Sequence, residues 1–507
     1  MDNCNLYSLF QSRFPENRNE VFLVHPRISL SFADIEHFSA KLGAILQTLG
    51  VFKSDRVMVQ IEKSPENVML YLACLRIGAV FVPLNTAYTA NEVAYFLEDA
   101  DPKVFVCDPA NEATIGGICK SNASTTILTL GNNGNGSLID KMSSEQQSSV
   151  VVWCDSDDLA SIVYTSGTTG RSKGAMITHE NLTSNALTLH KYWAWKPGDV
   201  LIHALPIFHI HGLFVALHCA LLNASKVLFH ERFDANKIIQ DLPTASVFMG
   251  VPTFYTRLLA TPNFNQGACR SIRLFISGSA PLLFETFSEF KERTNHSILE
   301  RYGMTEAGMI TSNPYQSSQR IPSTVGYALP GIIARISDTK GEELSPGEIG
   351  VLEISGPNVF AGYWQMPEKT AEEFRDDGFF VTGDMATMEE DGRIAIVGRV
   401  KDLVISGGYN VYPKEIELII DELFGVKEST VIGVPHPDFG EAVVAVVVVV
   451  ADEGENISEA SIKSQLVNTL AKFKQPKKIF FTKALPRNAM GKVQKKLLRE
   501  IYADTFK

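Results

Sequence analysis

Short apolar runs with the composition of buried strands alternate with segments of helical periodicity along much of the chain. Within the first 150 residues, strand patterns at 56–61, 79–83 and 103–107 accompany helical patterns at 32–49 and 65–77. A second series of strand patterns lies at 160–164, 200–205, 226–229, 245–249 and 274–277. Alternation of this kind requires largely parallel strands joined by helices, so we expect an α/β protein built of βα-layered sheets.

The pattern changes after about residue 326. Between 326 and 396, short segments separated by Gly and Pro predict antiparallel hairpins or a small barrel-like β region. After residue 398, strand and helix patterns resume over a length sufficient for a small α+β domain. We therefore expect a large N-terminal domain, residues 1–400, and a small C-terminal domain, residues 401–507, with a hinge at Lys401.

The net charge of the 507-residue chain is −11, which argues against a nucleic-acid-binding protein. The charge is uneven, because residues 463–507 hold twelve Lys or Arg against two acids. A local basic surface of this kind suits an anionic small molecule. We expect small-molecule substrates, no nucleic acid, and a monomer or dimer.

The seven cysteines include no Cys-x-x-Cys pair, so neither a disulfide framework nor a zinc site is expected. The first twenty residues lack an apolar signal segment. The longest apolar run, 442–451, is too short to cross a bilayer and predicts a buried strand. A cytoplasmic location without a membrane span is the expectation.

The most informative stretch for chemistry is YTSGTTGRSKG at 164–174, a glycine- and hydroxyl-rich loop that follows an apolar strand. Glycines let backbone N–H groups approach phosphate oxygens, and hydroxyls and ammonium add donors. The spacing is not that of a Walker A loop. An ordinary flexible turn is the alternative, but the ordered string after a strand favours phosphate binding.

This loop is one of six motifs through which the chain resembles the adenylate-forming superfamily of acyl-CoA synthetases, peptide-synthetase adenylation domains and luciferases. The other five, in family order, are PIFHIHG at 206–212, ERYGMTE at 300–306, TGD at 382–384, GRVKD at 398–402 and PRNAMGK at 486–492. RLFISGSAPL at 273–282 and TSNPY at 311–315 are most similar to malonyl-CoA synthetases.

The resemblance implies a two-step reaction with ATP, Mg²⁺ and coenzyme A. A carboxylate attacks the α-phosphorus of ATP and releases pyrophosphate, and the CoA thiol then displaces AMP. The residues that the resemblance assigns to ATP and AMP are Thr165, Ser166, Gly167, Thr168, Thr169, Gly170, Lys173, Ser279, Ala280, Pro281, Tyr302, Gly303, Met304, Thr305, Asp384, Arg399 and Lys492.

Several of these residues have individual roles by resemblance, each with a plainer alternative. Thr305 would touch the α-phosphate and Glu306 would hold Mg²⁺, whereas a lone acid there could merely begin a helix. Asp384 and Arg399 would bind the ribose hydroxyls, although Gly-Asp is also a turn signal. Tyr302 would stack on adenine, and a buried tyrosine without a ligand is its alternative.

The C-terminal domain would rotate about Lys401 between the two steps. Lys492 would reach between the acyl carboxylate and the α-phosphate, while most neighbouring lysines are expected to be solvated surface charges. After rotation, Gly407, Gly408 and Tyr409 would line the path of the CoA pantetheine. An ordinary glycine turn is the alternative for that segment.

The acyl side of the site is assigned to Ser277, His209, His211 and Arg301. Two-residue spacing of the histidines on one strand face would also permit a metal pair, and packed core histidines are a further alternative. By resemblance, His209 closes the pocket as a catalytic residue. Strand alternation puts Arg301 opposite Tyr302, facing the acyl pocket, where its guanidinium favours a dicarboxylate. An internal salt bridge of Arg301 is the alternative.

The sequence therefore predicts an ATP-dependent carboxylate–CoA ligase, with malonate as the expected acid. Three alternatives stay open. The first is a synthetase for another small or medium-chain acid, and the second is a free-standing adenylation enzyme that loads a carrier protein. The third is an inactive homologue, which the intact set of motif residues disfavours.

Overall fold

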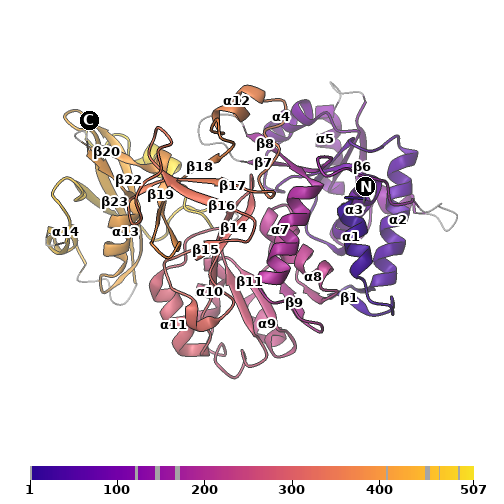
Figure 1. The fold of residues 1–507 in the computed structure, drawn as a ribbon, viewed down its shortest axis with the longest axis horizontal. Coiled ribbons are helices and arrows are strands. Elements are labelled where there is room, and N and C mark those ends of the chain that lie inside the picture. The colour runs from indigo at the N-terminus through magenta and orange to yellow at the C-terminus, as the bar shows by residue number, and fades with distance from the viewer. Residues whose placement is uncertain are drawn as a thin grey trace.

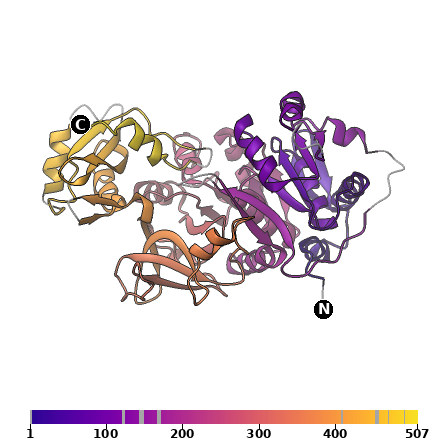
Figure 2. The same cartoon turned by 90° about the horizontal axis from the view of Figure 1, so that it is seen from above.

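The computed structural model describes residues 3–119, 124–142, 149–165, 172–406, 409–450, 457–467, 469–488 and 491–506. The C-terminal domain lies at one end of the molecule and the N-terminal helices α1 (Leu6–Arg13) and α2 (Phe32–Thr48) lie at the other (Figures 1 and 2). A small antiparallel sheet lies beside the C-terminal domain. The expected α/β architecture is confirmed.

The first sheet has six strands in the order β6-β5-β3-β4-β7-β8. Its strands are β3 (Arg56–Gln60), β4 (Val80–Pro83), β5 (Val104–Cys107), β6 (Thr126–Thr129), β7 (Leu159–Thr165) and β8 (Lys173–Thr178). All neighbouring pairs are parallel except β7 and β8, which form an antiparallel hairpin. The central strands β4 and β5 are buried along their whole length, as parallel strands covered on both faces must be.

The second sheet has nine strands in the order β15-β14-β13-β12-β11-β9-β10-β1-β2. Its strands are β1 (Val21–His25), β2 (Ile28–Ser31), β9 (Val200–His203), β10 (Lys226–Phe229), β11 (Val247–Gly250), β12 (Leu274–Ser277), β13 (Leu299–Met304), β14 (Gly308–Ser312) and β15 (Tyr327–Ala328). The pairing of β1 with β10 joins the N-terminal hairpin to this later sheet. The first 150 residues thus contribute to two sheets.

Local sequence accounts for the helix boundaries. Ser31 caps α2 in a capping box with Asp34, and Ser64 caps α3 (Pro65–Ile77) with proline at its first turn. Gly78 ends α3 at φ 70°, a conformation that glycine adopts without strain. The other helices of the N-terminal domain are α4 (Ala90–Ala100), α5 (Glu112–Ile118), α6 (Ser137–Asp140), α7 (His179–Tyr192), a π-helix (His211–Leu217), α8 (His218–Leu222), α9 (Ala235–Asp241), α10 (Pro252–Leu259), α11 (Phe284–Thr294) and α12 (Pro367–Glu372).

The region after residue 326 forms the predicted antiparallel structure, a four-stranded sheet in the order β16-β17-β18-β19. Its strands are β16 (Ile333–Ser337), β17 (Gly350–Ser355), β18 (Phe380–Met388) and β19 (Ile394–Arg399). Apolar side chains of this sheet belong to the main core of the N-terminal domain. It is an open sheet that packs on that core.

The C-terminal domain has cores of its own, formed only by residues from Val404 onward. Its elements are β20 (Val404–Ser406), β21 (Tyr409–Val411), α13 (Pro413–Asp421), β22 (Val426–His436), β23 (Gly440–Val449), α14 (Glu459–Val467), β24 (Lys478–Phe481) and α15 (Lys495–Ile501). The apolar run at 442–451 supplies most of β23, which is paired with β22 and β24. The domain boundary at residue 400 stays a prediction.

Other expectations concern cysteines and membranes. No disulfide is present in the described parts of the chain, and six cysteines are buried. Within the same residues, every helix is too short or too polar to span a bilayer.

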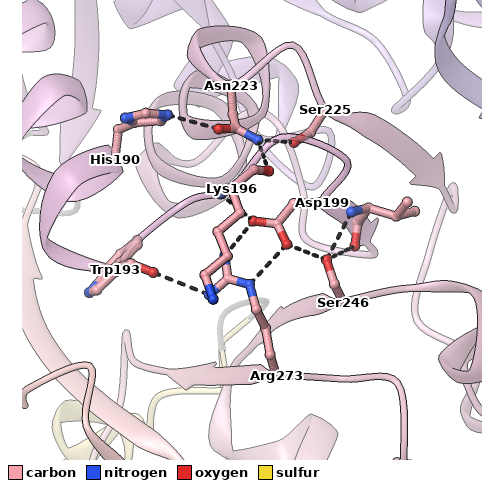
Figure 3. Close-up of polar contacts among 9 residues, drawn as sticks. His190, Trp193, Lys196, Asp199, Asn223, Ser225, Ser246 and Arg273 are labelled. Carbon is pink, nitrogen blue, oxygen red and sulfur yellow. Dashed lines mark hydrogen bonds and ion pairs between the residues drawn. The ribbon is translucent and has the colours of Figure 1, made fainter.

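An ion pair between buried Asp199 and half-buried Arg273 aligns three neighbouring strands of the second sheet at their starts (Figure 3). Asp199 precedes β9, Ser246 precedes β11 and Arg273 precedes β12. The Asp199 carboxylate accepts hydrogen bonds from Arg273 Nε at 2.9 Å and from Ser246 Oγ at 2.7 Å. Arg273 Nη1 also donates to the Trp193 carbonyl at 3.3 Å, which ties the end of α7 to the same point.

The ionised form of Asp199 is the one that this network stabilises. Burial alone would raise the pKa of Asp199, but hydrogen bonds from Arg273, the Lys196 N–H and Ser246 lower it below its ordinary value of 3.8. A depressed carboxylate pKa contributes stability above the unfolded value and loses it as pH falls through the folded value. This contribution is therefore complete at neutral pH.

We expect Asp199→Asn to lower the free energy of unfolding of the N-terminal domain at pH 7 by about 3 kcal/mol, because it leaves the half-buried Arg273 cation unpaired. Glu289→Gln is the control, since it removes an exposed helix-surface pair with Arg293 and should change stability by less than about 0.5 kcal/mol. Denaturant unfolding of both variants measures the difference. Equal, small changes would contradict the assigned role of Asp199.

Candidate active site

The candidate site lies where strands of the second sheet end. His203 ends β9, Gly250 ends β11 and Ser277 ends β12. The segment after β9 carries His209 and the segment after β12 carries the predicted adenine loop. Carboxyl ends of adjacent parallel strands meet at one sheet edge, which is where ligands bind in such folds.

Arg301 in β13 is buried, with 3% of its surface exposed. Its Nε and Nη2 atoms have no hydrogen-bond partner among the described residues. No acid among those residues forms an ion pair with Arg301. Burial lowers the pKa of Arg301 to about 9, and nearby Tyr255 opposes this shift. The alternative of an internal salt bridge is therefore not supported.

The backbone at Gly278 lies directly against the Arg301 guanidinium. A Cβ atom added at Gly278 would lie 2.4 Å from Arg301 Cζ, closer than side chains approach one another. The φ of Gly278 is not in the left-handed region. Glycine is therefore required here by the limited space beside the Arg301 guanidinium and not by the backbone conformation.

Two further polar groups beside Arg301 lack partners. Ser277 Oγ and His211 Nε2 are buried without a hydrogen-bond partner in the described structure. His211 Nδ1 lies 3.2 Å from Ser279 Oγ, so Nε2 is the nitrogen that is left for a ligand. Burial lowers the pKa of His211, and Arg301 lowers it further. The shift indicates a neutral imidazole next to a cation.

His209 lies in the segment between β9 and the π-helix that begins at His211. Its Nδ1 accepts a hydrogen bond from the His211 N–H at 3.2 Å. Burial lowers the pKa of His209 to about 3, with further contributions from Lys492 and Arg301. The alternative of a metal pair on one strand face does not apply, because His211 begins a π-helix. The described residues contain no group of three or more His, Cys, Asp or Glu side chains placed to hold a metal ion.

The predicted ribose-binding residues come together on a different sheet. Asp384 and Arg399 are directly paired residues of β18 and β19, and Arg399 Nε lies 2.5 Å from Asp384 Oδ1. The Tyr302 hydroxyl donates to the other oxygen of Asp384. Burial raises the pKa of Asp384, and Arg399 opposes the rise. Asp384 thus lies within a strand and faces Tyr302.

The predicted phosphate loop falls between β7 and β8, which pair as antiparallel strands, whereas a Walker A loop joins a strand to a helix. Ser166, Gly167, Thr168, Thr169 and Gly170 lie outside the described residues. Thr165 and Lys173 flank the loop as paired residues of β7 and β8. Lys173 Nζ lies 3.2 Å from Glu373 Oε1 and 3.9 Å above the Tyr363 ring.

Glu306 lies in the turn between β13 and β14, so the alternative of a helix N-terminal acid does not apply. It is buried, and burial raises its pKa. Tyr363 Oη donates to Glu306 Oε1 at 3.1 Å, which places Glu306 on the same ring as Lys173. Thr305, Met304 and Gly303 precede it, half-buried, along the strand end.

The predicted adenine loop, Ser279-Ala280-Pro281, follows β12. Ser279 has φ 72°, a left-handed conformation that is uncommon outside glycine and is often found at functional sites.

The sequence reasoning missed Glu300, which is buried with Oε2 unpartnered in the described structure. Burial raises the pKa of Glu300 to about 8, and the Leu282 backbone opposes the rise. In the sequence, an acid next to an arginine within an apolar strand is the signal that could have identified Glu300.

The C-terminal domain contributes Lys492. Its pKa is lowered by desolvation first and then by Arg399, whereas Asp384 and Glu306 raise it. The Lys492 side chain is exposed, and its pKa responds to groups on the side of the site formed by Arg399, Asp384 and Glu306.

The CoA side of the site is only partly described. Gly407 and Gly408 lie outside the described residues, and the exposed Tyr409 ring stacks on Phe473 with centroids 4.7 Å apart. Lys401 is exposed in the one-turn helix Val400–Asp402 that connects the domains. Within the described part of this tail, six basic residues pair with acids, namely Lys463, Lys474, Lys478, Arg487, Lys495 and Arg499. The basic surface is correspondingly reduced.

Comparison with known proteins agrees with this arrangement. The model of the AMP-binding enzyme family matches residues 10–364, and that of the AMP-binding enzyme C-terminal domain matches residues 415–492. The ATP-bound crystal structure of MatB from Rhodopseudomonas palustris superposes with a TM-score of 0.97 at 50% identity, covering 100% of both chains.

Two curated relatives have different named activities. Feruloyl-CoA synthase from an Amycolatopsis species is 34% identical over 93% of this chain and 94% of its own length. Malonate–CoA ligase from Arabidopsis thaliana is 34% identical over 89% of this chain and 78% of its own length.

The chain belongs to the AMP-binding, adenylate-forming enzyme family. Within that family it is an AMP-forming acyl-CoA synthetase, a carboxylate–CoA ligase that uses ATP and CoA.

Proposed function

We propose that the enzyme converts malonate, ATP and CoA into malonyl-CoA, AMP and pyrophosphate. The observation that carries this proposal is the set of unpartnered buried polar groups at Arg301, Ser277 and His211. A buried guanidinium without a partner is costly, and a carboxylate satisfies it through two parallel hydrogen bonds. The acid therefore brings a second carboxylate of its own.

The size of the acid follows from the same residues. Arg301 and Lys492 both lower the pKa of His209, which supports an anion site near the lysine that we assign to adenylation. One carboxylate must reach phosphorus while the other meets Arg301. Malonate, with a single carbon between its carboxylates, suits this short separation.

The relatives support malonate without excluding other acids. The Arabidopsis relative is named a malonate–CoA ligase, whereas the Amycolatopsis relative is named for a bulky aromatic acid. A synthetase for another small acid, or an enzyme that loads a carrier protein, is the alternative. A long apolar acid is disfavoured, because it would leave Arg301 unpaired.

In the first step, the reacting carboxylate attacks the α-phosphorus and pyrophosphate leaves. We assign charge neutralisation to Lys173 on the phosphate-loop side and to Lys492 between carboxylate and α-phosphate. Thr305 is assigned to the α-phosphate. Tyr302 is assigned to adenine, and Asp384 with Arg399 to the ribose.

Glu306 fits a Mg²⁺ site, because Mg²⁺ uses one or two carboxylates and completes its coordination with phosphate oxygens and water. Its carboxylate is buried near Lys173 and keeps capacity beyond the Tyr363 hydrogen bond. When bound, the ion would neutralise phosphate charge.

In the second step, the CoA sulfur attacks the acyl-adenylate carbonyl, the carbonyl–phosphate bond breaks, and AMP leaves. We assign the change between steps to rotation about Lys401, which moves Lys492 away. The segment Gly407-Gly408-Tyr409 then guides the pantetheine. The compact connection at Val400–Asp402 lets one domain turn while both cores persist.

Lys492→Ala should abolish most adenylation yet largely spare thioester formation from preformed malonyl-adenylate, because the lysine leaves the site between the steps. A loss of about a hundredfold or more in pyrophosphate release is expected. Lys496→Ala is the matched control, since Lys496 is exposed on the same tail. Equal losses in both half-reactions would contradict the assignment.

Arg301→Ala should reduce kcat/KM for malonate by about 2–5 kcal/mol of transition-state binding, while acetate and butyrate change far less. Steady-state kinetics with malonate, methylmalonate, acetate and butyrate measure this selectivity. Arg301→Lys keeps the charge but loses the two-pronged geometry, so its effect should be intermediate. If all four acids lost the same factor, Arg301 would be structural.

Gly278→Ala should lower malonate activity because its new methyl group displaces the Arg301 guanidinium. Added to Arg301→Ala, the same change should cost much less, since the clashing group is gone. This double-mutant cycle isolates the coupling between the two positions. An undiminished cost of Gly278→Ala in the Arg301→Ala enzyme would show that Gly278 acts independently of Arg301.

A further inference from the structure

A buried lysine lies outside all the motifs assigned to the reaction. Lys63 follows β3 in the first sheet and has 7% of its surface exposed. Its Nζ lies 2.8 Å from His203 Nδ1 and 2.9 Å from the His203 carbonyl oxygen. The ammonium also lies 4.2 Å above the Phe229 ring. Lys63 thus joins the first sheet to the end of β9 in the second.

The hydrogen bonds determine which nitrogen of His203 carries the proton. His203 Nε2 lies 2.9 Å from the Gly212 carbonyl oxygen. A carbonyl oxygen only accepts, so Nε2 donates, and Nδ1 of the neutral ring accepts from Lys63. Burial lowers the pKa of His203, and Lys63 lowers it further, which keeps the ring neutral.

Gly212 is the far end of the loop that carries His209 and His211. The Gly212 N–H donates to the His209 carbonyl at 3.1 Å. A Cβ atom at Gly212 would lie 2.2 Å from the Pro206 carbonyl oxygen, so the loop is tightly closed there. The His203–Gly212 bond therefore joins the two ends of the loop, at β9 and at the π-helix.

We propose that Lys63 and His203 are positioning residues that hold this loop, and with it the acyl-pocket wall, in place. Desolvating a lysine lowers its pKa and costs stability, as the downward shift at Lys63 indicates, although Glu231 opposes the shift. Neither residue belongs to the motifs that we assign to ATP. The inference rests on the acyl pocket proposed above but not on malonate as its occupant.

The expected signature is a selective effect on the acid. Lys63→Met should raise the KM for the carboxylate by about tenfold to a hundredfold, as small displacements of binding groups do, and leave the KM for ATP within about twofold. The ATP groups at Tyr302, Asp384 and Arg399 lie on other strands, so they should stay in place.

Substitutions of His203 provide the control. His203→Gln keeps an N–H donor that can reach the Gly212 carbonyl, and His203→Leu removes it. The Gln variant should recover most of the carboxylate affinity that the Leu variant loses. Because Lys63 acts through His203, adding Lys63→Met to His203→Leu should have little further effect.

The experiment measures pyrophosphate release by the full-length enzyme with malonate, or with the most active acid of the panel if malonate is inert. Thermal unfolding with and without ATP identifies variants that fail to fold. Parallel rises in both KM values, no change with Lys63→Met, or no recovery with His203→Gln would overturn the proposal. Inactivity toward malonate alone would refute only the malonate assignment.

Discussion

The alignment of β9, β11 and β12 at their starts is the constraint on which the rest of the site depends. Asp199, Ser246 and Arg273 fix these strands on one side of the sheet, and the site residues follow from their opposite ends. A strand has a fixed rise per residue, so alignment at one end determines the positions at the other. The polar network at the strand starts therefore sets the spacing of the residues that we assign to the acyl pocket.

The second constraint is a concentration of positive charge in an acidic protein. Arg301 and Lys492 both depress the pKa of His209, and Arg301 depresses that of His211. Such groups repel one another until an anion arrives, so ligand binding relieves an existing cost. Preorganised charge of this type acts without reorganisation during the reaction. The overall charge of −11 conceals this local feature.

Sequence reasoning anticipated what short-range rules determine. The helices at 32–49 and 65–77, the strand at 442–451 and the opposite orientation of Arg301 and Tyr302 follow from local periodicity. It could not anticipate pairings over long distances, such as β1 with β10, or the π-helix at His211. Lys63 resembled any surface lysine, because its partners His203 and Gly212 are far along the chain.

The separate cores of the C-terminal domain have a consequence for the stability of the enzyme as a whole. Residues from Val404 onward bury their apolar side chains among themselves, and the connection to the rest of the chain is a single helical turn at Val400–Asp402. Two bodies joined in this way melt as two cooperative units, so no single free energy of unfolding describes the protein. The separate core that lets the C-terminal domain rotate also lets that domain lose its structure on heating independently of the rest of the chain.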